Sequence, residues 1–333
     1  MKRVLVTGAS GFVGSHLVEA ASKLGWEVHA IVRPSSSTKA IESFVTKFVH
    51  ANMGNIDELK SLFEQTSYDY VIHAAAMTKA KNEADMLKVN VGYTENLITA
   101  AFAPSSNSID RFIYVSSLAA IGPIPYVCEQ GIHEDSPYNP LTVYGRSKRT
   151  SELSIREKFS DKPISVFRPT AVYGPREKDL FILFDTLNKG FDPYIGTNPQ
   201  KLSFIYVKDL VDALLKGCIV SQDALQFYNI ADGQVYSKYA MANIFKDVFN
   251  KRALRLHLPY SIVSAFANIS QFFYRFSNNT PVLYPERLLE LTAENWNCDI
   301  SKAKEKLDFS PKYDLNRGLK ETLLWYKSNN WLK

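Results

Sequence analysis

The chain has 333 residues, of which 46% are hydrophobic and 22% charged, and its formal net charge is +5. This composition is typical of a globular protein with one large domain or a main domain with a smaller partner. Acidic residues are interleaved with the lysines and arginines, which argues against a nucleic-acid-binding surface. The three cysteines and six histidines show no spacing typical of a disulfide framework or a metal site, so we predict neither.

The beginning of the chain, "MKRVLVTGAS", holds too short an apolar run for a signal peptide or a membrane span. The longest later candidate, residues 258–276, is interrupted by Ser264, Asn268, Ser270 and Gln271. We therefore expect a cytoplasmic protein without a transmembrane segment.

Short runs rich in β-branched or aromatic residues alternate with longer helical patterns over the first half of the chain. These runs cover residues 3–7, 27–32, 47–51, 68–76, 111–117 and 163–169. Because each parallel strand needs a crossover connection, the alternation predicts an α/β fold with a doubly wound parallel sheet and helices on both faces.

Three glycines follow the first of these runs and open an amphipathic helix. In "VTGASGFVG", Gly8 suits a tight turn, Gly11 allows a close approach of the backbone to a pyrophosphate, and Gly14 lets the helix pack on the strand. The helix N-terminus adds N–H donors and the positive end of a dipole. This spacing after a strand predicts a dinucleotide site.

The glycine loop therefore places a dinucleotide-binding domain at residues 1–170. After that point the helix–strand alternation loosens, with strand-like pieces at 203–207 and 227–231. We predict that sheet elements from about 203–235 complete the first domain. Residues 171–333 are then mainly a smaller α/β lobe for the substrate, interlaced with the first domain rather than tethered to it.

The segment after the second predicted strand, "IVRPSSSTK", indicates which dinucleotide is bound. Arg33 stands where an acidic residue would bind an adenosine 2′-hydroxyl, and Ser35 and Lys39 follow closely. A cationic fork matches a 2′-phosphate, so NADP(H) is favoured over NAD(H). A solvated loop arginine, with NAD(H) as the cofactor, is the alternative.

A tyrosine and a lysine lie four positions apart in "VYGRSK". On a helix, Tyr144 and Lys148 would project side by side. A nearby cation favours the phenolate and moves the tyrosine pKa from about 10 towards neutral, which would make a proton shuttle. A solvated surface pair is the alternative for these two residues taken alone.

Four motifs resemble those of the extended short-chain dehydrogenase/reductase superfamily, the NAD-dependent epimerase/dehydratase enzymes. They are "TGASGFVG", "YVSSLAAIG", "YGRSK" and "RPTAVYGP", in the order and spacing typical of that group. The likeness continues to the C-terminal "DFSPKYDLNRGLKETLLWYKSNNWL". It implies a Rossmann fold, an NAD(P)-dependent enzyme with a small-molecule substrate, and a homodimer.

The resemblance also implies roles for individual residues. Tyr144 would exchange a proton with the substrate oxygen, Ser117 would hydrogen-bond that oxygen, and Lys148 would hold the ribose and lower the tyrosine pKa. Asn90 would support the lysine and the ribose. By the same likeness the cofactor contacts are Gly8, Ser10, Gly11, Phe12, Val13, Gly14, Arg33, Ser35, Lys39, Asn52, Met53, Ala74, Ala75, Ala76, Asn90, Val115, Tyr144, Lys148, Pro169 and Val172.

Three substitutions relative to that superfamily bear on the substrate. Leu118, Ala119 and Ala120 follow Ser117, where related dehydratases and decarboxylases carry carboxylates. Ala171 and Leu202 stand where enzymes of sugar nucleotides usually carry an asparagine and an arginine. A charged diphosphate left without polar partners would bind poorly, so these positions favour a more apolar substrate.

The resulting expectation is an NADP(H)-dependent oxidoreductase, nearest the 3β-hydroxysteroid dehydrogenase and dihydroflavonol reductase branch, that interconverts a secondary alcohol and a ketone. A nucleotide-sugar 4-epimerase is the first alternative, with Arg176, Lys178 or Lys201 holding the diphosphate. A non-catalytic nucleotide sensor is a lesser alternative.

Residues 261–276 carry an apolar stripe at helical spacing. Its members are Ile262, Phe266, Ile269, Phe273 and Phe276, with Phe272 beside them. The stripe predicts either a lid over an apolar substrate, a surface in peripheral contact with a membrane, or a helix packed on the small lobe.

Overall fold

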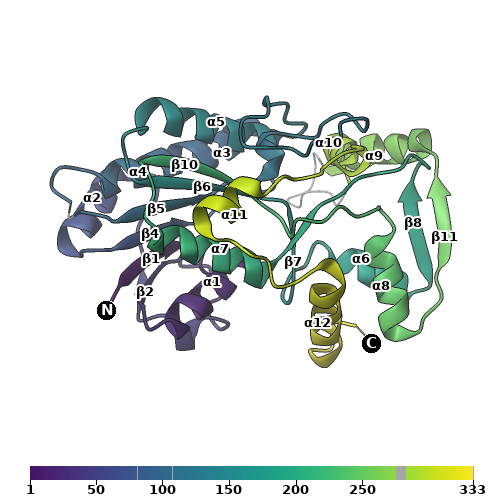
Figure 1. The fold of residues 1–333 in the computed structure, drawn as a ribbon, viewed down its shortest axis with the longest axis horizontal. Helices are drawn as coiled ribbons and strands as arrows, with labels where there is room; N and C mark the ends of the chain where they lie inside the picture. The colour runs from purple at the N-terminus through teal and green to yellow at the C-terminus, as the bar shows by residue number, and fades with distance from the viewer. Residues whose placement is uncertain (81, 107, 275–282, 333) are drawn as a thin grey trace.

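A computed structural model describes residues 1–80, 82–106, 108–274 and 283–332 and centres on a seven-stranded parallel sheet (Figure 1). The sheet strands are β1 (Arg3–Thr7), β2 (Glu27–Ile31), β3 (Lys47–Val49), β4 (Tyr70–His73), β5 (Arg111–Val115), β6 (Ile164–Pro169) and β10 (Leu225–Ile230). Their order is β10-β6-β5-β4-β1-β2-β3. The predicted α/β Rossmann fold is confirmed.

The strand order reverses between β1 and β4, since the chain runs outward through β2 and β3 before it crosses back. Parallel doubly wound sheets bind their ligands outside the carboxyl ends of the strands at such a switch point. The loops after β1, β4, β5 and β6 are therefore the ones that shape a site.

The helices cover both faces of this sheet and build the smaller lobe. They are α1 (Phe12–Lys23), α2 (Ile56–Gln65), α3 (Glu83–Leu87), α4 (Tyr93–Ala101), α5 (Val143–Lys158), α6 (Phe181–Asn188), α7 (Val207–Ile219), α8 (Ala240–Phe249), α9 (Tyr260–Tyr274), α10 (Pro285–Thr292), α11 (Ser301–Leu307) and α12 (Leu315–Ser328). Short 3-10 turns occur at η1 (Glu42–Phe44) and η3 (Leu118–Ala120), and a π-helical turn at η2 (Lys88–Gly92).

Alternation along each strand divides the core between the two faces. In β1, Val4 and Val6 face one core together with Leu17 and Val18 of α1, and α7 and α11 contribute to the same cluster. Leu5 faces the opposite core, where α2, α4 and α5 pack. This alternation follows from the period of two in strand side chains and explains why both faces need a helical cover (Figure 1).

The smaller lobe has its own apolar core between α6, α8 and α12, with Phe184, Phe245 and Tyr326 fully buried. Two separate two-stranded sheets accompany it, β7 (Ala171–Tyr173) with β9 (Phe204–Tyr206), and β8 (Phe191–Ile195) with β11 (Leu254–Leu258). Strand β10 returns from this half of the chain to pair with β6, so the two halves are interlaced in space (Figure 1). The domain boundary at residue 170 and the homodimer stay predictions.

Within the described ranges, no helix combines the length and the apolar character needed to span a bilayer.

Candidate active site

The glycine loop lies between β1 and α1, at the predicted switch point. Gly8 has a φ of +70°, and a Cβ there would come within 2.6 Å of the Ala75 backbone nitrogen. A Cβ on Gly14 would lie 2.0 Å from the Gly8 carbonyl oxygen, so the helix approaches the turn more closely than any side chain allows. Both positions therefore require glycine for the reasons that the sequence indicated.

The start of α1 is suited to an anionic group. Gly11 is the N-cap residue, no side chain caps the helix, and its first turn carries no acidic residue. Its first N–H groups, on residues that include Phe12 and Val13, consequently keep their donors for a ligand. The loop therefore fits the pyrophosphate of a dinucleotide.

A chain of buried hydrogen bonds links this loop to the helix that follows β4. The Ala75 amide donates to Thr7 Oγ1 (3.2 Å), Thr7 Oγ1 lies 2.6 Å from His73 Nδ1, and His73 Nε2 lies 2.9 Å from Thr94 Oγ1. Thr94 in turn donates to the Asn90 carbonyl (2.8 Å). Burial, together with the charge of Lys148, lowers the pKa of His73 to about 3, so the imidazole is neutral. Because Thr94 donates its own proton to Asn90, it accepts from His73, and we therefore assign the ring proton to Nε2.

Sequence reasoning missed Thr7, His73 and Thr94. Each has an ordinary strand or helix position, and their roles depend on contacts between residues up to 68 positions apart. The sign of this hydrogen-bonded connection in the sequence was that the apolar strands β1 and β4 each end in a polar residue, Thr7 and His73.

The three predicted catalytic residues come from two adjacent elements. Ser117 follows β5 and caps η3, and Tyr144 and Lys148 lie on the first two turns of α5. The Thr142 side chain accepts a hydrogen bond from the Gly145 amide (3.1 Å) and so caps the helix, which starts at Val143. The helical spacing predicted for Tyr144 and Lys148 is present, and the solvated-pair interpretation does not hold for Lys148, which is 1% exposed.

The pKa of Tyr144 moves in the direction opposite to our expectation. Burial raises it to about 12, with a further increase from the charge of Glu290, while the hydroxyl of Ser117 lowers it in part. Lys148 Nζ lies 6.0 Å from the centre of the Tyr144 ring and makes its hydrogen bonds elsewhere. Desolvation of the phenolate therefore sets the direction of this shift, and the lowering of the tyrosine pKa by Lys148 stays a prediction.

Lys148 reaches back to strand β5. Its Nζ donates to the Val115 carbonyl (2.8 Å) and to the Tyr114 hydroxyl (3.2 Å), and it lies 4.6 Å from the centre of the Tyr114 ring. Burial lowers its pKa to about 7, and the carboxylate of Glu152 acts in the opposite direction. Lys148 is thus a buried amine that changes protonation state near neutral pH.

Asn90 lies in the π-helical turn η2 and contacts the catalytic helix through Ser147. Its Oδ1 accepts from the Met77 amide (2.7 Å), and its Nδ2 donates to the Met77 carbonyl (2.8 Å) and to Ser147 Oγ (2.9 Å). Its carbonyl accepts from Ser151 Oγ (2.9 Å). The amide therefore binds backbone and Ser147 rather than Lys148, the partner that the resemblance implied. The π turn aims it there, as such turns often do at functional sites.

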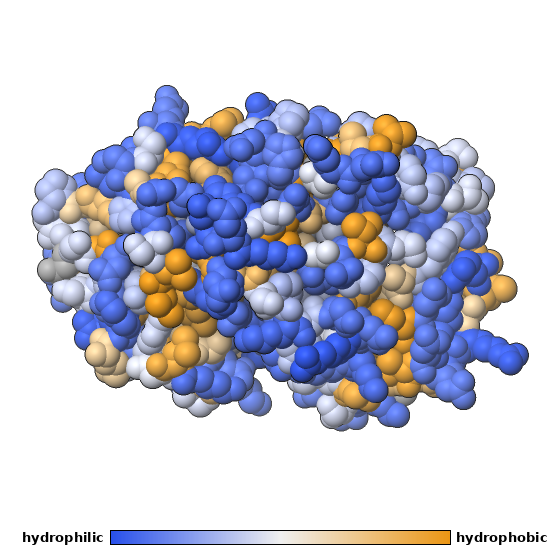
Figure 2. Space-filling model, in the orientation of Figure 1, coloured by the Kyte–Doolittle hydropathy of each residue, from blue (hydrophilic) through white to orange (hydrophobic). Residues whose placement is uncertain are grey.

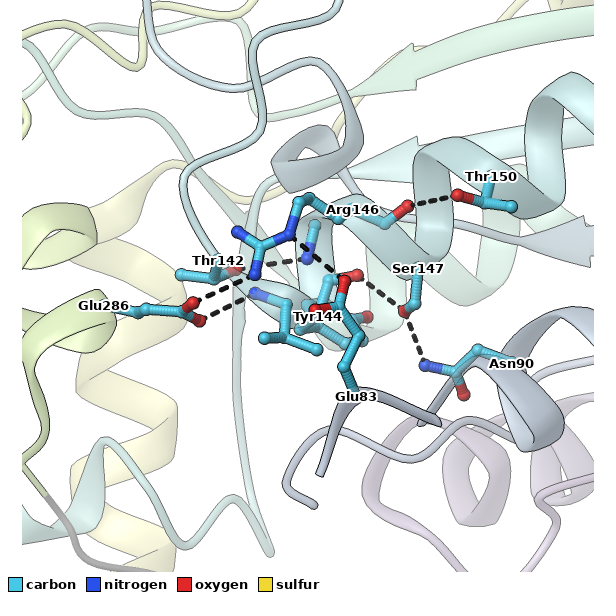
Figure 3. Close-up of polar contacts among 10 residues, drawn as sticks. Glu83, Asn90, Thr142, Tyr144, Arg146, Ser147, Thr150 and Glu286 are labelled. Atoms are coloured by element: carbon cyan, nitrogen blue, oxygen red, sulfur yellow. Dashed lines mark hydrogen bonds and ion pairs between the residues drawn. The ribbon is translucent and has the colours of Figure 1, made fainter. Parts of the chain in front are cut away.

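Figure 3 shows two acidic side chains from other helices that contact the first turn of the catalytic helix. Glu286 of α10 accepts from the Val143 amide (2.7 Å) and from the Arg146 guanidinium (3.0 Å), while Glu83 of α3 also accepts from Arg146 (3.3 Å). These contacts tie segments from opposite ends of the chain to the turn that carries Tyr144.

The residues predicted to contact the adenosine half of the cofactor lie in the loops after β2 and β3. Arg33 is exposed two residues beyond β2, which pairs with β1, and Ser35 and Lys39 are exposed in the same loop. Asn52 closes a turn by accepting from the Gly54 amide (3.0 Å), which leaves its Nδ2 as a donor for an adenine. Met53 packs against the apolar core of that face. The arrangement fits a dinucleotide along the sheet edge.

A cavity of about 520 Å³ opens beside Ser117. Predicted contacts Pro169 and Val172 line it, and so do Ala171 and Leu202, the two positions that favour an apolar substrate. Its other lining residues are Leu118, Ala119, Thr170, Glu177, Asp179, Leu180, Leu183, Pro193, Tyr194, Ile195, Gln200, Ser203, Phe204, Ser237, Lys238, Met241, Arg287, Glu290, Leu291 and Trp296. This size suits a drug-sized molecule.

Across the part of the chain that the structure covers, no three His, Cys, Asp or Glu side chains are grouped so that they could hold a metal ion.

Comparison with known proteins bears on this geometry. Residues 4–231 match the model of the NAD dependent epimerase/dehydratase family. A sterol-4-alpha-carboxylate 3-dehydrogenase (decarboxylating) of Dictyostelium discoideum is 26% identical over 96% of this chain and 100% of its own length. A putative UDP-glucose 4-epimerase of Methanocaldococcus jannaschii is 25% identical over 98% of this chain and 99% of its own.

Among solved structures, a UDP-glucose 4-epimerase of Thermotoga maritima superposes with a TM-score of 0.75, at 22% identity over 98% of this chain and 99% of that one. At this identity the likeness establishes the fold. The combination of a seven-stranded sheet with small C-terminal sheets is shared with such epimerase structures.

Proposed function

The chain belongs to the NAD dependent epimerase/dehydratase family of enzymes, and we propose that it is an NADP(H)-dependent oxidoreductase acting on a relatively apolar, steroid- or flavonoid-like substrate. It would interconvert a secondary alcohol and a ketone. The family as a whole uses NAD(P), so the choice of NADP(H) is part of the proposal and depends on Arg33. The observation that carries the substrate class is the lining of the cavity beside Ser117.

Charge in that cavity argues against a nucleotide diphosphate. Its lining holds three acids, Glu177, Asp179 and Glu290, but only two cations. Arg287 is paired with Glu290 (2.7 Å), and Lys238 donates to the Gly196 carbonyl (3.1 Å). A diphosphate would enter a site where both cations already have partners and acids outnumber them, which costs binding free energy.

The cations that the epimerase alternative would use to hold a diphosphate lie outside the cavity lining. Arg176 bonds His16 (3.0 Å) and Glu19 (3.1 Å) of α1, and Lys201 donates to the Tyr126 carbonyl (2.9 Å). Neither residue lines the cavity, and neither does Lys178. These positions support an apolar substrate over a charged one.

The Thr170 side chain offers a polar group in the cavity that is suited to orient such a substrate. The Thr170 hydroxyl is buried and lacks a hydrogen-bond partner among the described residues, and Thr170 lines the cavity next to Ala171. A buried polar atom without a partner costs stability, so a ligand oxygen at this place would relieve that cost.

In the proposed reaction, Tyr144 donates the proton to the carbonyl oxygen during reduction and accepts it during oxidation. Ser117 hydrogen-bonds the same oxygen and stabilises its developing charge. The bound nicotinamide supplies or accepts the hydride. Lys148 orients the ribose and, when charged, favours the phenolate over the state that burial alone would set.

The relatives do not decide between substrates, because the sterol dehydrogenase and the putative epimerase are almost equally distant from this chain. A nucleotide-sugar 4-epimerase therefore stays as the second candidate, since Ser117, Tyr144 and hydride transfer would suffice for it. The alternative of a non-catalytic sensor is set aside by family membership.

One screen separates the two candidates. The purified protein is incubated with NADP+ or NADPH and either hydroxysteroids and flavonoid-like ketones or UDP-, GDP- and dTDP-sugars. Absorbance of the reduced nicotinamide and chromatography of the sugars are followed together. Net cofactor turnover with the apolar panel is the expected result. Sugar interconversion without net cofactor change would overturn the proposal and establish the epimerase.

A further inference from the structure

Helix α9 presents its predicted apolar stripe to solvent. Ile262 and Phe266 are each 62% exposed and Ile269 is 56% exposed, and Phe272 is exposed as well. The helix instead buries Val263 and Ala267, which lie on the neighbouring side of the helix, about 100° from Ile262 and Phe266. The expectation that this stripe packs on the small lobe is wrong for these residues. Phe276 and the side chain of Phe273, also predicted members, lie outside the described residues.

The described members of the stripe do not form a substrate lid either, since none of them lines the cavity beside Ser117. Helix α9 lies against α10, and α10 contributes Arg287, Glu290 and Leu291 to the cavity wall (Figure 1). The apolar stripe is therefore one layer removed from the cavity and faces outward.

The strand that precedes α9 extends this apolar surface. Leu254 and Leu258 of β11 are exposed, and Phe191 of β8, which pairs with Leu254, is exposed too. Residues two apart in a strand share a face of the sheet, so Phe191, Pro193 and Ile195 of β8 lie on one face. Pro193 and Ile195 also line the cavity beside Ser117. Figure 2 shows apolar side chains at the surface of the end of the molecule that carries α9.

The part of the sequence that includes β11 and α9 carries positively charged residues and no acidic ones. Between Asp247 and Glu286 the sequence has no acidic residue, whereas it has Lys251, Arg252, Arg255 and Arg275. Lys251 and Arg252 are exposed directly before β11, while Arg255 is paired with Asp192 (3.3 Å). The acids of the neighbouring α10, Glu286 and Glu290, are paired with Arg146 and Arg287. An exposed apolar helix that carries no acidic residue and follows exposed cations has the features of an element that lies in a membrane interface.

We propose that α9 and the exposed face of β11 dock the protein on an anionic phospholipid bilayer. In this arrangement Ile262, Phe266 and Ile269 insert among the acyl chains, and Lys251 and Arg252 contact the headgroup phosphates. The protein lies on the bilayer without crossing it. This proposal goes beyond the enzymatic function and does not depend on it, because docking requires no turnover.

The test is co-sedimentation with vesicles of phosphatidylcholine, with or without about one third phosphatidylglycerol. We expect the whole chain to bind the anionic vesicles, and Phe266→Glu/Ile269→Glu to bind them more than roughly tenfold more weakly, since it removes insertion and adds like charge. Leu324→Glu on α12, where the leucine is 49% exposed, is the matched control and should bind like the wild type. Thermal unfolding of each variant reports whether the fold is intact.

A second variant tests the electrostatic part independently. Lys251→Glu/Arg252→Glu should weaken binding to the anionic vesicles several-fold, and added salt should weaken the wild type in the same way. Absence of binding by the wild type, or equal binding by wild type and Phe266→Glu/Ile269→Glu, would overturn the proposal. So would a dimer in solution that this variant dissociates while vesicles bind neither form, because the stripe would then be a subunit interface.

Discussion

The Glu152 carboxylate of α5 and the Arg168 guanidinium of β6 form an ion pair at 2.6 Å in which both side chains are completely buried. Ser116 (2.5 Å) and Tyr138 (2.8 Å) donate to the same carboxylate, and Arg168 donates to the Tyr138 hydroxyl (2.9 Å). Glu152 lies one turn beyond Lys148 on the catalytic helix. The pair therefore anchors that helix to the sheet directly behind the catalytic residues.

Removing one partner of this pair should destabilise the fold strongly. Glu152→Gln leaves the Arg168 cation buried without a counter-charge, and we expect the free energy of unfolding to fall by about 3–5 kcal/mol. The double variant Glu152→Gln/Arg168→Met should recover part of that loss, since it removes the unpaired cation and keeps an amide for Ser116 and Tyr138. Urea denaturation measures both, and losses that simply add would argue against the pair.

Tyr144→Phe should lower turnover by about 10²–10⁴-fold while NADP(H) binding is nearly unchanged, because only the proton donor is lost. Tyr68→Phe is the control, since this buried phenol bonds His29 (3.0 Å) far from the cavity and should keep wild-type turnover. Steady-state kinetics on a substrate found by the screen, with calorimetry of the cofactor, gives the answer. Wild-type rates in Tyr144→Phe would remove the tyrosine from the proposed mechanism.

Lys148→Met should weaken cofactor binding and also reduce turnover, since the proposed role of the lysine serves both the ribose and the phenol. We expect a loss of roughly tenfold or more in each quantity. Calorimetric titration of NADP(H) and single-turnover rates separate the two effects. A variant that loses turnover alone would restrict Lys148 to the proton transfer.

Arg33→Ala should weaken NADP(H) binding by roughly tenfold and leave NAD(H) binding almost unchanged, because a guanidinium recognises the 2′-phosphate and not the 2′-hydroxyl. Arg317→Ala, which removes an exposed arginine of α12, is the control. Isothermal titration with both cofactors is the measurement. Tighter binding of NAD(H) by the wild type would reverse the cofactor assignment.

The free energy of unfolding should fall as the pH drops below about 6.5, a pH at which most carboxylates are still ionised. Burial lowers the pKa of His73 to about 3, of His16 to about 4, and also that of His29. The unfolded chain, with a histidine pKa of about 6.5, therefore takes up protons first as the pH falls, so the stability present above pH 6.5 is lost below it. Asp232, whose pKa burial raises to about 6, opposes the trend, as do Glu134, Glu177 and Asp209, whose pKa values burial also raises. Glu27, whose pKa the hydrogen bond from Arg3 lowers, acts in the same direction as the histidines.

We expect the free energy of unfolding to fall by roughly 1 kcal/mol or more between about pH 6 and pH 5. His73→Asn should reduce this slope by up to one proton, even where it lowers stability at every pH. Denaturant titrations at a series of pH values report the slope, and an unchanged slope in the variant would show that His73 titrates normally.

Local features of the sequence determined the strands of the sheet and the order of the site motifs along the chain. The β-branched runs specified six strands of the sheet, and the glycine spacing specified the turn, because Gly8 adopts a positive φ and Gly14 meets a steric limit set by Gly8, only six positions away. The second limit on Gly8, its close approach to Ala75, comes from the fold. The four-residue spacing of Tyr144 and Lys148 held because helical periodicity is local. Boundaries were less accurate, since the predicted strand 68–76 ends at His73, where the chain leaves the sheet to form the cleft.

Tertiary structure decided what depends on distant neighbours. The pKa values of Tyr144 and Lys148 follow from desolvation by surrounding elements, which spacing along one helix does not report. Asn90 binds Met77 and Ser147 because a π turn and a loop meet there. The stripe of α9 was evident from its period, but the sequence alone did not say which face would be covered. Packing buried Val263 and Ala267 and left Phe266 exposed, since an amphipathic pattern defines two faces and only the fold supplies the partner for one of them.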